Sequence, residues 1–228
     1  FKAPEFTRLY GGNLVGEYTG TDLADPATCP GGRPSAAPGC AALVRPEQVF
    51  GGNLALKPET SKQRSVGVVF APVDNFNLSL DWWEIERENT IRAAPLAAQI
   101  RNYDAFRENW IRNAAGQVIA IDQRFINSGG TLTRGIELDA NVTIDAFAGG
   151  RWRIGLNGSY IDTFKTKDLA TLPYSDNLVG EHVRYFNLPL KWKHTLGVSY
   201  LRGDWMHNLT QIYRHGYKDE VPVSVRNG

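Results

Sequence analysis

The sequence predicts an all-β fold, in which about six antiparallel strands in a meander belong to a larger transmembrane β-barrel with long extracellular loops. Three observations predict this fold. Apolar and polar residues alternate along six segments, short turns and long connections follow one another, and a tryptophan and a tyrosine recur eight residues apart on the apolar face. A membrane barrel carries apolar side chains on one face of each strand, so its overall composition resembles that of a soluble protein.

The alternation is clearest in residues 133–144 and continues in residues 151–160 after a short turn. Period-two alternation of this length indicates a strand with one apolar and one polar face. Two such segments around a short turn form a hairpin. We expect a second hairpin before this one, with its turn at residues 72–75, and a third after it, with its turn at residues 202–204.

The connections between the hairpins are long, and this asymmetry is typical of outer-membrane barrels, in which the short turns are periplasmic. We expect one partial barrel domain over residues 1–228. Its parts are mostly extracellular loop at 1–60 and three hairpins at 61–217, with surface loops at about 92–120 and 165–190. In the first loop, residues 95–110 have helical spacing, and a small turn is expected around Gly116.

The aromatic pairs separate a membrane sheet from a soluble one. Each pair spans about 26 Å along a strand, which a strand tilt of about 40° reduces to about 20 Å along the membrane normal, close to the apolar band of a barrel. The expected membrane-interface aromatics are Trp82, Trp152, Tyr160, Trp192, Tyr200, Trp205 and Tyr213. The alternative is that these side chains line the core of a β-sandwich.

The two cysteines, Cys29 and Cys40, lie in a segment rich in proline, glycine and alanine. Their spacing suits a small loop closed by a disulfide, and a disulfide would indicate an oxidising compartment such as the periplasm or the cell surface. The alternative is a pair of free thiols in a cytosolic loop.

Other chemistry finds little support. Basic and acidic residues number 25 and 24, so nothing indicates a nucleic-acid partner. The carboxylates at 81, 84, 86 and 88 could suggest a glycosidase, but a strand that leaves the membrane for charged surface sequence explains them better. The four histidines lack metal-ligand spacing, and no nucleotide-binding or nucleophile-elbow motif occurs. We therefore expect no catalytic residue, no metal and no cofactor.

Four segments, in the same order along the chain, resemble TonB-dependent outer-membrane receptors. Residues 1–4 (FKAP) look like the family's F-[RK]-A-P segment, and residues 53–61 (NLALKPETS) are similar to its N-x-x-L-K-P-E-T-S stretch. Residues 78–91 resemble the strand that follows. Residues 127–138 resemble the strand with an N-x-G motif and a [TS]-x-G-[IV]-E motif. No single match is specific, but together they cover most of residues 1–215.

The resemblance implies a 22-stranded barrel in a Gram-negative outer membrane, with an N-terminal plug domain that is absent from this chain. It implies active uptake of a scarce nutrient, such as a ferric siderophore, cobalamin or a glycan, with energy supplied by the TonB complex through the plug. The implied partners are therefore outer-membrane lipid, the plug, TonB and a small ligand. Surface loops contact ligands in such receptors, so Tyr103, Trp110 and Arg112 are candidate ligand-facing residues.

We expect the chain to be a piece of a longer protein, because both ends look cut. Two other classes stay open. One is a soluble, secreted β-rich module that binds or hydrolyses its substrate, and the other is a plain porin, which lacks the family motifs. The soluble module differs from the barrel in the surroundings of Trp152, Ile154, Leu156 and Tyr160, which would be a protein core instead of lipid.

Overall fold

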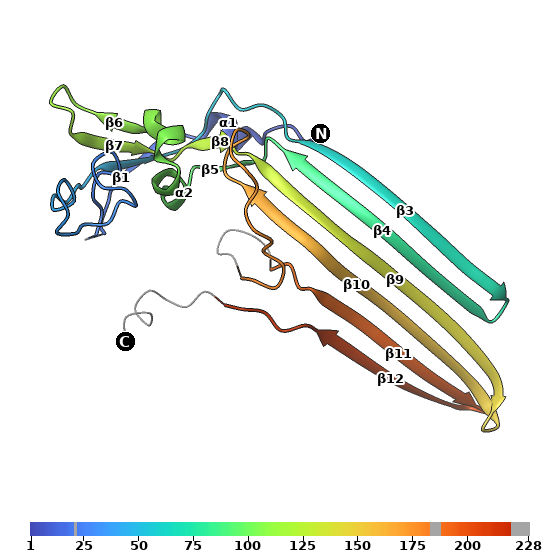
Figure 1. Cartoon of the computed structure of the whole chain (residues 1–228). Helices are drawn as coiled ribbons and strands as arrows, with labels where there is room; N and C mark the ends of the chain where they lie inside the picture. Colours follow the sequence, from blue (N-terminus) through green and yellow to red (C-terminus); the bar gives the residue numbers. More distant parts are fainter. Residues whose placement is uncertain (21, 183–187, 220–228) are drawn as a thin grey trace. The chain divides into compact units, whose positions relative to one another are not determined.

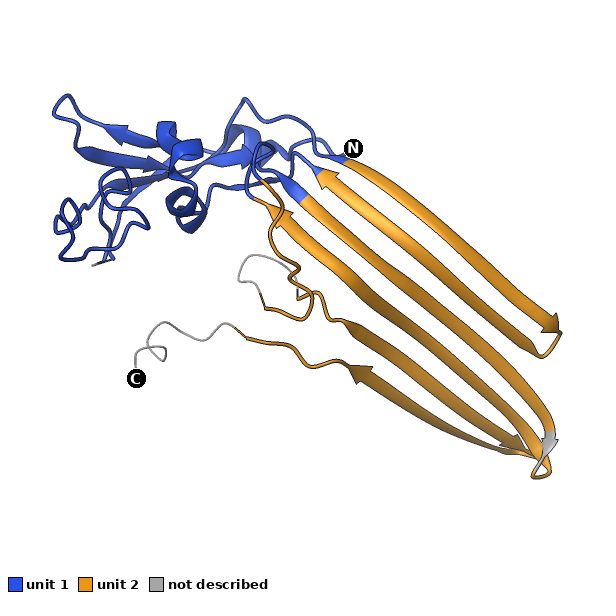
Figure 2. Cartoon of the chain, viewed as in Figure 1, with its two compact units in different colours: residues 1–60, 88–130, 168–172 blue, residues 61–87, 131–167, 173–228 orange. Residues whose placement is uncertain are grey.

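A computed structural model describes residues 1–20, 22–182 and 188–219, so part of the second expected loop, residues 183–187, lies outside the described residues. The chain divides into two compact units, which Figure 2 shows in different colours. Unit 1 contains residues 1–60, 88–130 and 168–172. Unit 2 contains residues 61–87, 131–167 and the described part of 173–228.

Unit 2 is a six-stranded sheet in a single layer (Figure 1). Its strands are β3 (Thr60–Val73), β4 (Phe76–Glu88), β9 (Gly130–Phe147), β10 (Gly150–Lys167), β11 (Trp192–Arg202) and β12 (Trp205–Arg214). The order across the sheet, β12-β11-β10-β9-β4-β3, follows the chain, so each strand pairs with the strands before and after it in this unit. The six strands in three hairpins confirm the predicted fold class.

Each hairpin closes with two residues, at 74–75, 148–149 and 203–204. Because the strands form a meander, these three turns lie at the same end of the sheet (Figure 1). Ala148 and Gly149 both have positive φ, at 56° and 74°, as a type I′ turn requires. The turns at 74–75 and 203–204 are shorter than expected, because β3 and β11 keep their pairing up to Val73 and Arg202.

Two strands are longer than the alternation predicts, since β9 and β10 each have 18 residues. At about 3.3 Å per residue such a strand reaches about 60 Å, roughly twice the thickness of a hydrocarbon core. The additional residues mix polar and apolar types without strict alternation, and backbone pairing continues through them.

The register of β10 with β11 keeps apolar residues opposite apolar residues. Ile154 pairs with Val198 and Leu156 with Leu196. Side-chain hydrogen bonds join the polar face of β9 to that of β10, from Ser159 to Glu137 at 3.0 Å among others. One face of the sheet is therefore apolar and the other polar, as the alternation predicts.

Unit 1 contains a four-stranded sheet of order β1-β2-β7-β6, a two-stranded sheet of β5 and β8, and three short helices. Its strands are β1 (Leu14–Glu17), β2 (Glu47–Phe50), β5 (Ile91–Ala93), β6 (Trp110–Arg112), β7 (Val118–Asp122) and β8 (Phe125–Asn127). Its helices are α1 (Phe6–Tyr10), α2 (Leu96–Arg101) and the 3-10 helix η1 (Tyr103–Asn109).

The expected helix at 95–110 is interrupted, because Asn102 between α2 and η1 has φ −121° and ψ 42°. The expected small turn around Gly116 joins β6 to β7. The larger sheet was not predicted. It depends on a parallel pairing of β2 with β7, in which Glu47 lies opposite Ala120, and four-residue strands such as β1 and β2 carry little alternation.

Apart from Pro189, the buried apolar side chains among the described residues belong to unit 1. The main cluster consists of Leu23, Trp110, Val118 and Ile121, and a second one contains Ala24 and the two cysteines. In unit 2, Val66, Leu80, Trp205 and Leu209 are between 43% and 73% exposed. In the described part of the chain, no helix is long and apolar enough to cross a membrane.

Candidate functional site

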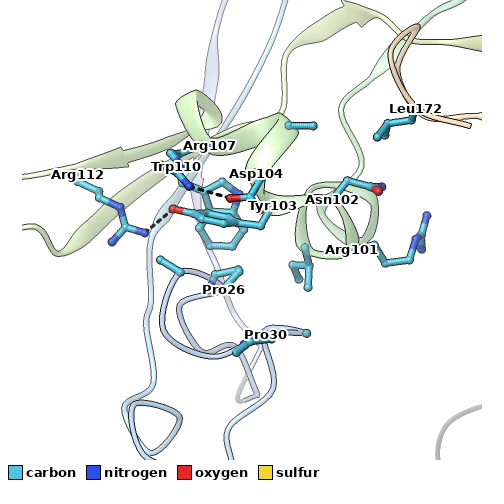
Figure 3. A pocket seen from close by; sticks show the side chains of 14 residues that line it. Pro26, Pro30, Arg101, Asn102, Tyr103, Asp104, Arg107, Trp110, Arg112 and Leu172 are labelled. Carbon is cyan, nitrogen blue, oxygen red and sulfur yellow. Dashed lines mark hydrogen bonds and ion pairs between the residues drawn. The ribbon is translucent and has the colours of Figure 1, made fainter.

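Unit 1 contains a pocket of about 960 Å³ (Figure 3). One wall is the segment with Pro26 and Pro30, and the other is formed by α2, η1 and β6. The side chains that line it are Pro26, Ala27, Pro30, Ile100, Arg101, Asn102, Tyr103, Asp104, Ala105, Arg107, Trp110, Arg112 and Leu172, together with Gly31. The three candidate ligand-facing residues, Tyr103, Trp110 and Arg112, are all among them.

Arg112 joins the two walls through an ion pair with Asp25. Its two terminal nitrogens donate to the two carboxylate oxygens at 2.6 and 2.8 Å, and one of them also donates to the Tyr103 hydroxyl at 3.0 Å. The hydrogen bonds from Arg112 hold the pKa of Asp25 below its usual range, against the opposing effect of burial. The same hydrogen bonds raise the pKa of Arg112, so both groups are charged near neutral pH.

Trp110 forms the base of the pocket and is only 3% exposed. It packs in the cluster with Leu23, Val118 and Ile121, and its ring meets that of Tyr103 edge to face at 5.9 Å between centroids. Its indole Nε1 has no hydrogen-bond partner among the described residues. Trp110 therefore supports the ring of Tyr103, which is half-buried and lies nearer the opening.

Two further arginines line the pocket and keep much of their surface accessible. The side chains of Arg101 and Arg107 are 65% and 68% exposed. Arg107 bonds to Asp104 at 2.7 Å, and Arg101 bonds to Asp168 at 3.2 Å. The pocket thus presents accessible guanidinium groups beside an aromatic ring.

The wall with Pro26 and Pro30 is closed by the Cys29–Cys40 disulfide, whose Cα atoms are 4.8 Å apart. The Thr28 hydroxyl also donates to the carbonyl of Gly39 at 3.1 Å. The positive φ of Gly39, 80°, brings its backbone against Thr28, where a Cβ would contact the Thr28 carbonyl. These contacts give the proline-rich segment a fixed shape although it contains no strand or helix.

Sequence reasoning missed Asp25, Arg101 and Arg107. Asp25 is 87 residues from Arg112, so no local pattern could connect them. Arg101 and Arg107 lie in segments with helical spacing, where a charged residue usually marks only the solvated face. The signal available in the sequence was the concentration of arginine and aromatic residues between 101 and 112.

Unit 2 presents the expected interface aromatics on one face, here called the apolar face, which carries Trp152, Ile154, Leu156 and Tyr160. The register places Trp152 opposite Tyr200 and Tyr160 opposite Trp192. Since the strands are antiparallel, the tryptophan–tyrosine pair of one strand meets that of the next in reverse order. Two rows of aromatic side chains result, separated by eight residues of strand.

The rows continue onto β12, where histidines join them. Tyr213 lies opposite His194 with its ring stacked at 5.2 Å, and Tyr200 lies opposite His207 at 6.3 Å. Trp205 stands opposite Arg202, next to the hairpin turn. Aromatic side chains with a polar group are suited to the boundary between lipid and water, because one part of the ring can meet lipid and the other water.

Three of the four carboxylates that could suggest a glycosidase bond to other groups. Glu84 accepts a hydrogen bond from Arg134 at 2.6 Å, Glu86 accepts one from the Tyr174 hydroxyl at 3.1 Å, and Asp81 accepts one from Ser79. Within the described ranges, no group of three or more histidine, cysteine or acidic residues could hold a metal ion.

Comparison with known proteins gives one family. Residues 1–224 match the family model described as TonB dependent receptor-like, beta-barrel. No curated protein matches the chain.

Solved structures with a similar fold include a mutant of the ferric enterobactin receptor PfeA from Pseudomonas aeruginosa in complex with enterobactin, at 14% identity and a TM-score of 0.44 over 74% of this chain. The siderophore receptor PirA from Acinetobacter baumannii is 18% identical over 75% of the chain, also with a TM-score of 0.44. The chain spans only 20% and 23% of the length of these two structures.

Proposed function

The chain belongs to the TonB-dependent receptor β-barrel family, and from this membership we propose that it is part of an outer-membrane receptor that takes up a scarce nutrient. Proteins of this family are transporters and not enzymes. We propose that the plug domain of the full-length protein closes the barrel, that TonB supplies energy through the plug, and that the apolar face of unit 2 contacts outer-membrane lipid.

The observation that carries the proposal is the exposed apolar face of the single-layered sheet, bordered by the two aromatic rows. Exposed apolar surface of this extent in water would favour aggregation. In a bilayer the same surface is satisfied by hydrocarbon, and the rows of Trp152 with Tyr200 and of Tyr160 with Trp192 would lie at the two interfaces. A soluble module would need a second layer over this face, and none of the described residues supplies one.

For the ligand we propose a ferric siderophore ahead of cobalamin or a glycan. The reason is the chemistry of the pocket in unit 1, where the guanidinium groups of Arg101 and Arg107 are largely exposed beside Tyr103. A chelate with negative charge and aromatic groups would gain charge-assisted hydrogen bonds from arginine and stacking with tyrosine. A neutral glycan carries no charge that could pair with either guanidinium group.

The test uses the full-length receptor that contains this chain, expressed in a Gram-negative strain lacking its own siderophore receptors. Uptake of ⁵⁵Fe is measured with a ferric tris-catecholate and a ferric hydroxamate, and cyanocobalamin and a maltooligosaccharide serve as the other two ligand classes. We expect uptake of one ferric chelate, dependent on TonB. Uptake of cyanocobalamin or the oligosaccharide alone would overturn the ligand class, and a water-soluble full-length protein would overturn the receptor itself.

The role of the pocket is tested with the double variant Arg101→Gln/Arg107→Gln. We expect binding of the transported chelate to weaken by about tenfold, which corresponds to about 1.4 kcal/mol. The matched control is Arg45→Gln, since Arg45 is an exposed arginine of unit 1 that does not line the pocket. Equal weakening by both changes would mean that general positive charge, and not the pocket, attracts the ligand.

A further inference from the structure

Three charged side chains stand on the apolar face of unit 2, where a membrane-facing surface would be expected to avoid charge. They are Arg64 of β3, Glu84 of β4 and Arg134 of β9, on three neighbouring strands. Because side chains alternate along a strand, Glu84 points to the same side as Trp82. Arg134 is likewise two residues from Ile136, which belongs to the apolar face. The three charged side chains are therefore on the apolar face of the sheet and not on its polar face.

Contacts between β4 and β9 fix the position of this cluster. Glu84 bonds to Arg134, and on the opposite face a Cβ at Gly135 would contact the ring of Trp83. Residues 84 and 83 thus lie beside 134 and 135, and the same alignment places Trp82 beside Ile136. The charged cluster begins at Glu84, two residues beyond Trp82. It lies about 7 Å farther along the strand, on the side away from the hairpin turns.

One carboxylate serves both arginines. Arg134 donates from Nε to one oxygen of Glu84 at 2.6 Å, and Nη1 of Arg64 lies 3.8 Å from the other oxygen. The side chain of Glu84 is 16% exposed, whereas those of Arg134 and Arg64 are 41% and 72% exposed. Within the described part of the chain, the terminal nitrogens of Arg134 have no partner. The cluster therefore keeps an excess of positive charge and accessible donors.

Neighbouring carboxylates do not bond to the donors of this cluster. Glu86 accepts a hydrogen bond from the Tyr174 hydroxyl at 3.1 Å, and Lys167 stands over the ring of the same tyrosine at 4.9 Å. Asp162 of β10 accepts a hydrogen bond from the Thr163 hydroxyl at 2.9 Å. Among the described residues, neither acid forms an ion pair with Arg64 or Arg134.

We propose that Arg64 and Arg134 together bind a phosphate group of an outer-leaflet lipid headgroup. The inference rests on the proposed function, since that function puts the end of the sheet with the long connections outside the cell and puts Trp82 at the lipid border. Guanidinium groups bind phosphate through paired, charge-assisted hydrogen bonds. A cationic cluster at headgroup depth also attracts anionic lipids electrostatically. Glu84 stands on the strand between the two arginines and is paired with both, which keeps their guanidinium groups near each other, so that one phosphate can reach both.

The test measures lipid binding by the full-length receptor in dodecyl maltoside micelles with native mass spectrometry. The probes are lipid A with both phosphates, the same lipid after removal of both phosphates, and inorganic phosphate as competitor. We expect the bis-phosphorylated lipid to bind at least about tenfold more tightly than the dephosphorylated one. Inorganic phosphate at the concentration of the lipid should not displace it, and displacement would assign the site to free phosphate and overturn the proposal.

The double variant Arg64→Gln/Arg134→Gln should remove this preference. Arg64→Gln alone should reduce it, and this single change is compatible with folding because the side chain is mostly exposed and lies near Glu84 only. The control is Arg153→Gln, an arginine on the polar face of β10. An unchanged preference in the Arg64 and Arg134 variants, or an equal loss in the control, would overturn the proposal.

Insertion of the receptor into phosphatidylcholine vesicles separates this inference from the proposed function. A receptor that inserts but does not distinguish the two lipids contradicts the phosphate site alone. A receptor that does not insert contradicts the membrane position on which the site depends.

Discussion

The indole ring of Trp192 covers Gly158 on the neighbouring strand, so closely that a Cβ at residue 158 would overlap the ring. Trp192 itself lies opposite Tyr160, and its Nε1 donates to Nδ1 of His194 at 2.8 Å. The glycine thus makes room for the ring of Trp192, which a side chain at residue 158 would force away from the sheet. Gly158 therefore allows Trp192 to take its place in the aromatic row beside Tyr160.

Replacing this glycine should therefore displace Trp192. We expect Gly158→Val to destabilise the receptor by about 1–3 kcal/mol, the usual cost of forcing extra atoms into a packed position. The measurement is urea unfolding of the full-length receptor in micelles, followed by tryptophan fluorescence. Gly197→Val is the matched control, because the nearest atom to a Cβ at Gly197 is 4.0 Å away. Equal destabilisation by both changes would show that the effect comes from glycine loss in general.

The sheet of unit 2 could be predicted because its pattern is local. A strand with one apolar face repeats its alternation within ten residues, as at 133–144 and 151–160, and its partner follows after a two-residue turn. The ends of β9 and β10 were missed because backbone pairing continues beyond the stretch in which apolar and polar residues alternate strictly. Alternation of apolar and polar residues indicates which face of a strand is apolar, but it does not indicate where backbone pairing stops.

Unit 1 could not be predicted in the same way. Its sheet joins β2 to β7, so Glu47 and Ala120 become neighbours across more than seventy residues of chain. The pocket shares this property, because Asp25 and Arg112 come together only in the folded unit. Residue type alone suggested Tyr103 and Trp110, but it could not show that Trp110 is buried beneath Tyr103.

The Asp25–Arg112 ion pair predicts an acid dependence of the pocket. Arg112 lowers the pKa of Asp25 in the folded protein, so the ionised carboxylate stabilises the fold above the usual aspartate pKa of about 4. This contribution is lost as the pH falls through the lowered folded value. Replacing Asp25 with asparagine should cost about 2 kcal/mol of local stability near pH 7, since a charge-assisted pair is lost.

Hydrogen exchange of β6 and β7 checks this, with Asp25→Asn compared with the unchanged receptor at each pH. The comparison at one pH cancels the chemical dependence of exchange on acidity. We expect a large difference in protection at pH 7 and a smaller one near pH 3. A difference of the same size at both pH values would mean that the charge of Asp25 contributes nothing.

Loss of the Cys29–Cys40 disulfide should loosen one wall of the pocket. Closing a loop of about 12 residues restricts the open chain by about 3 kcal/mol in the chain-entropy description. In the Cys29→Ser/Cys40→Ser variant we expect faster hydrogen exchange in residues 25–44 and weaker ligand binding, with exchange in unit 2 unchanged. Unchanged exchange in residues 25–44 would show that hydrogen bonds such as Thr28 to Gly39 hold the segment without the disulfide.

Asp168 joins several segments of unit 1. It accepts hydrogen bonds from Arg92 at 2.6 Å and from Arg101 and Asn102 at 3.2 Å each, and its backbone carbonyl accepts one from Gly129. Replacing it with asparagine removes the negative charge that Arg92 and Arg101 share, and we expect exchange in α2 to accelerate about tenfold.

The control for this change is Asp104→Asn. Asp104 is 88% exposed and bonds only to Arg107 among the described residues, so its loss should alter exchange little. Similar acceleration in both variants would remove the distinction between a carboxylate that joins several segments and a surface ion pair.

Spin labels on β10 show whether the apolar face of unit 2 meets hydrocarbon. Single cysteines replace Ile154, Leu156, Arg153 and Asn157 in the full-length receptor reconstituted in vesicles, and collision of each label with oxygen and with a water-soluble nickel complex is measured. We expect labels at 154 and 156 to collide preferentially with oxygen, which concentrates in lipid, and labels at 153 and 157 to collide preferentially with nickel. Labels at 154 and 156 that are sheltered from both reagents would place this face in a protein core and not against lipid.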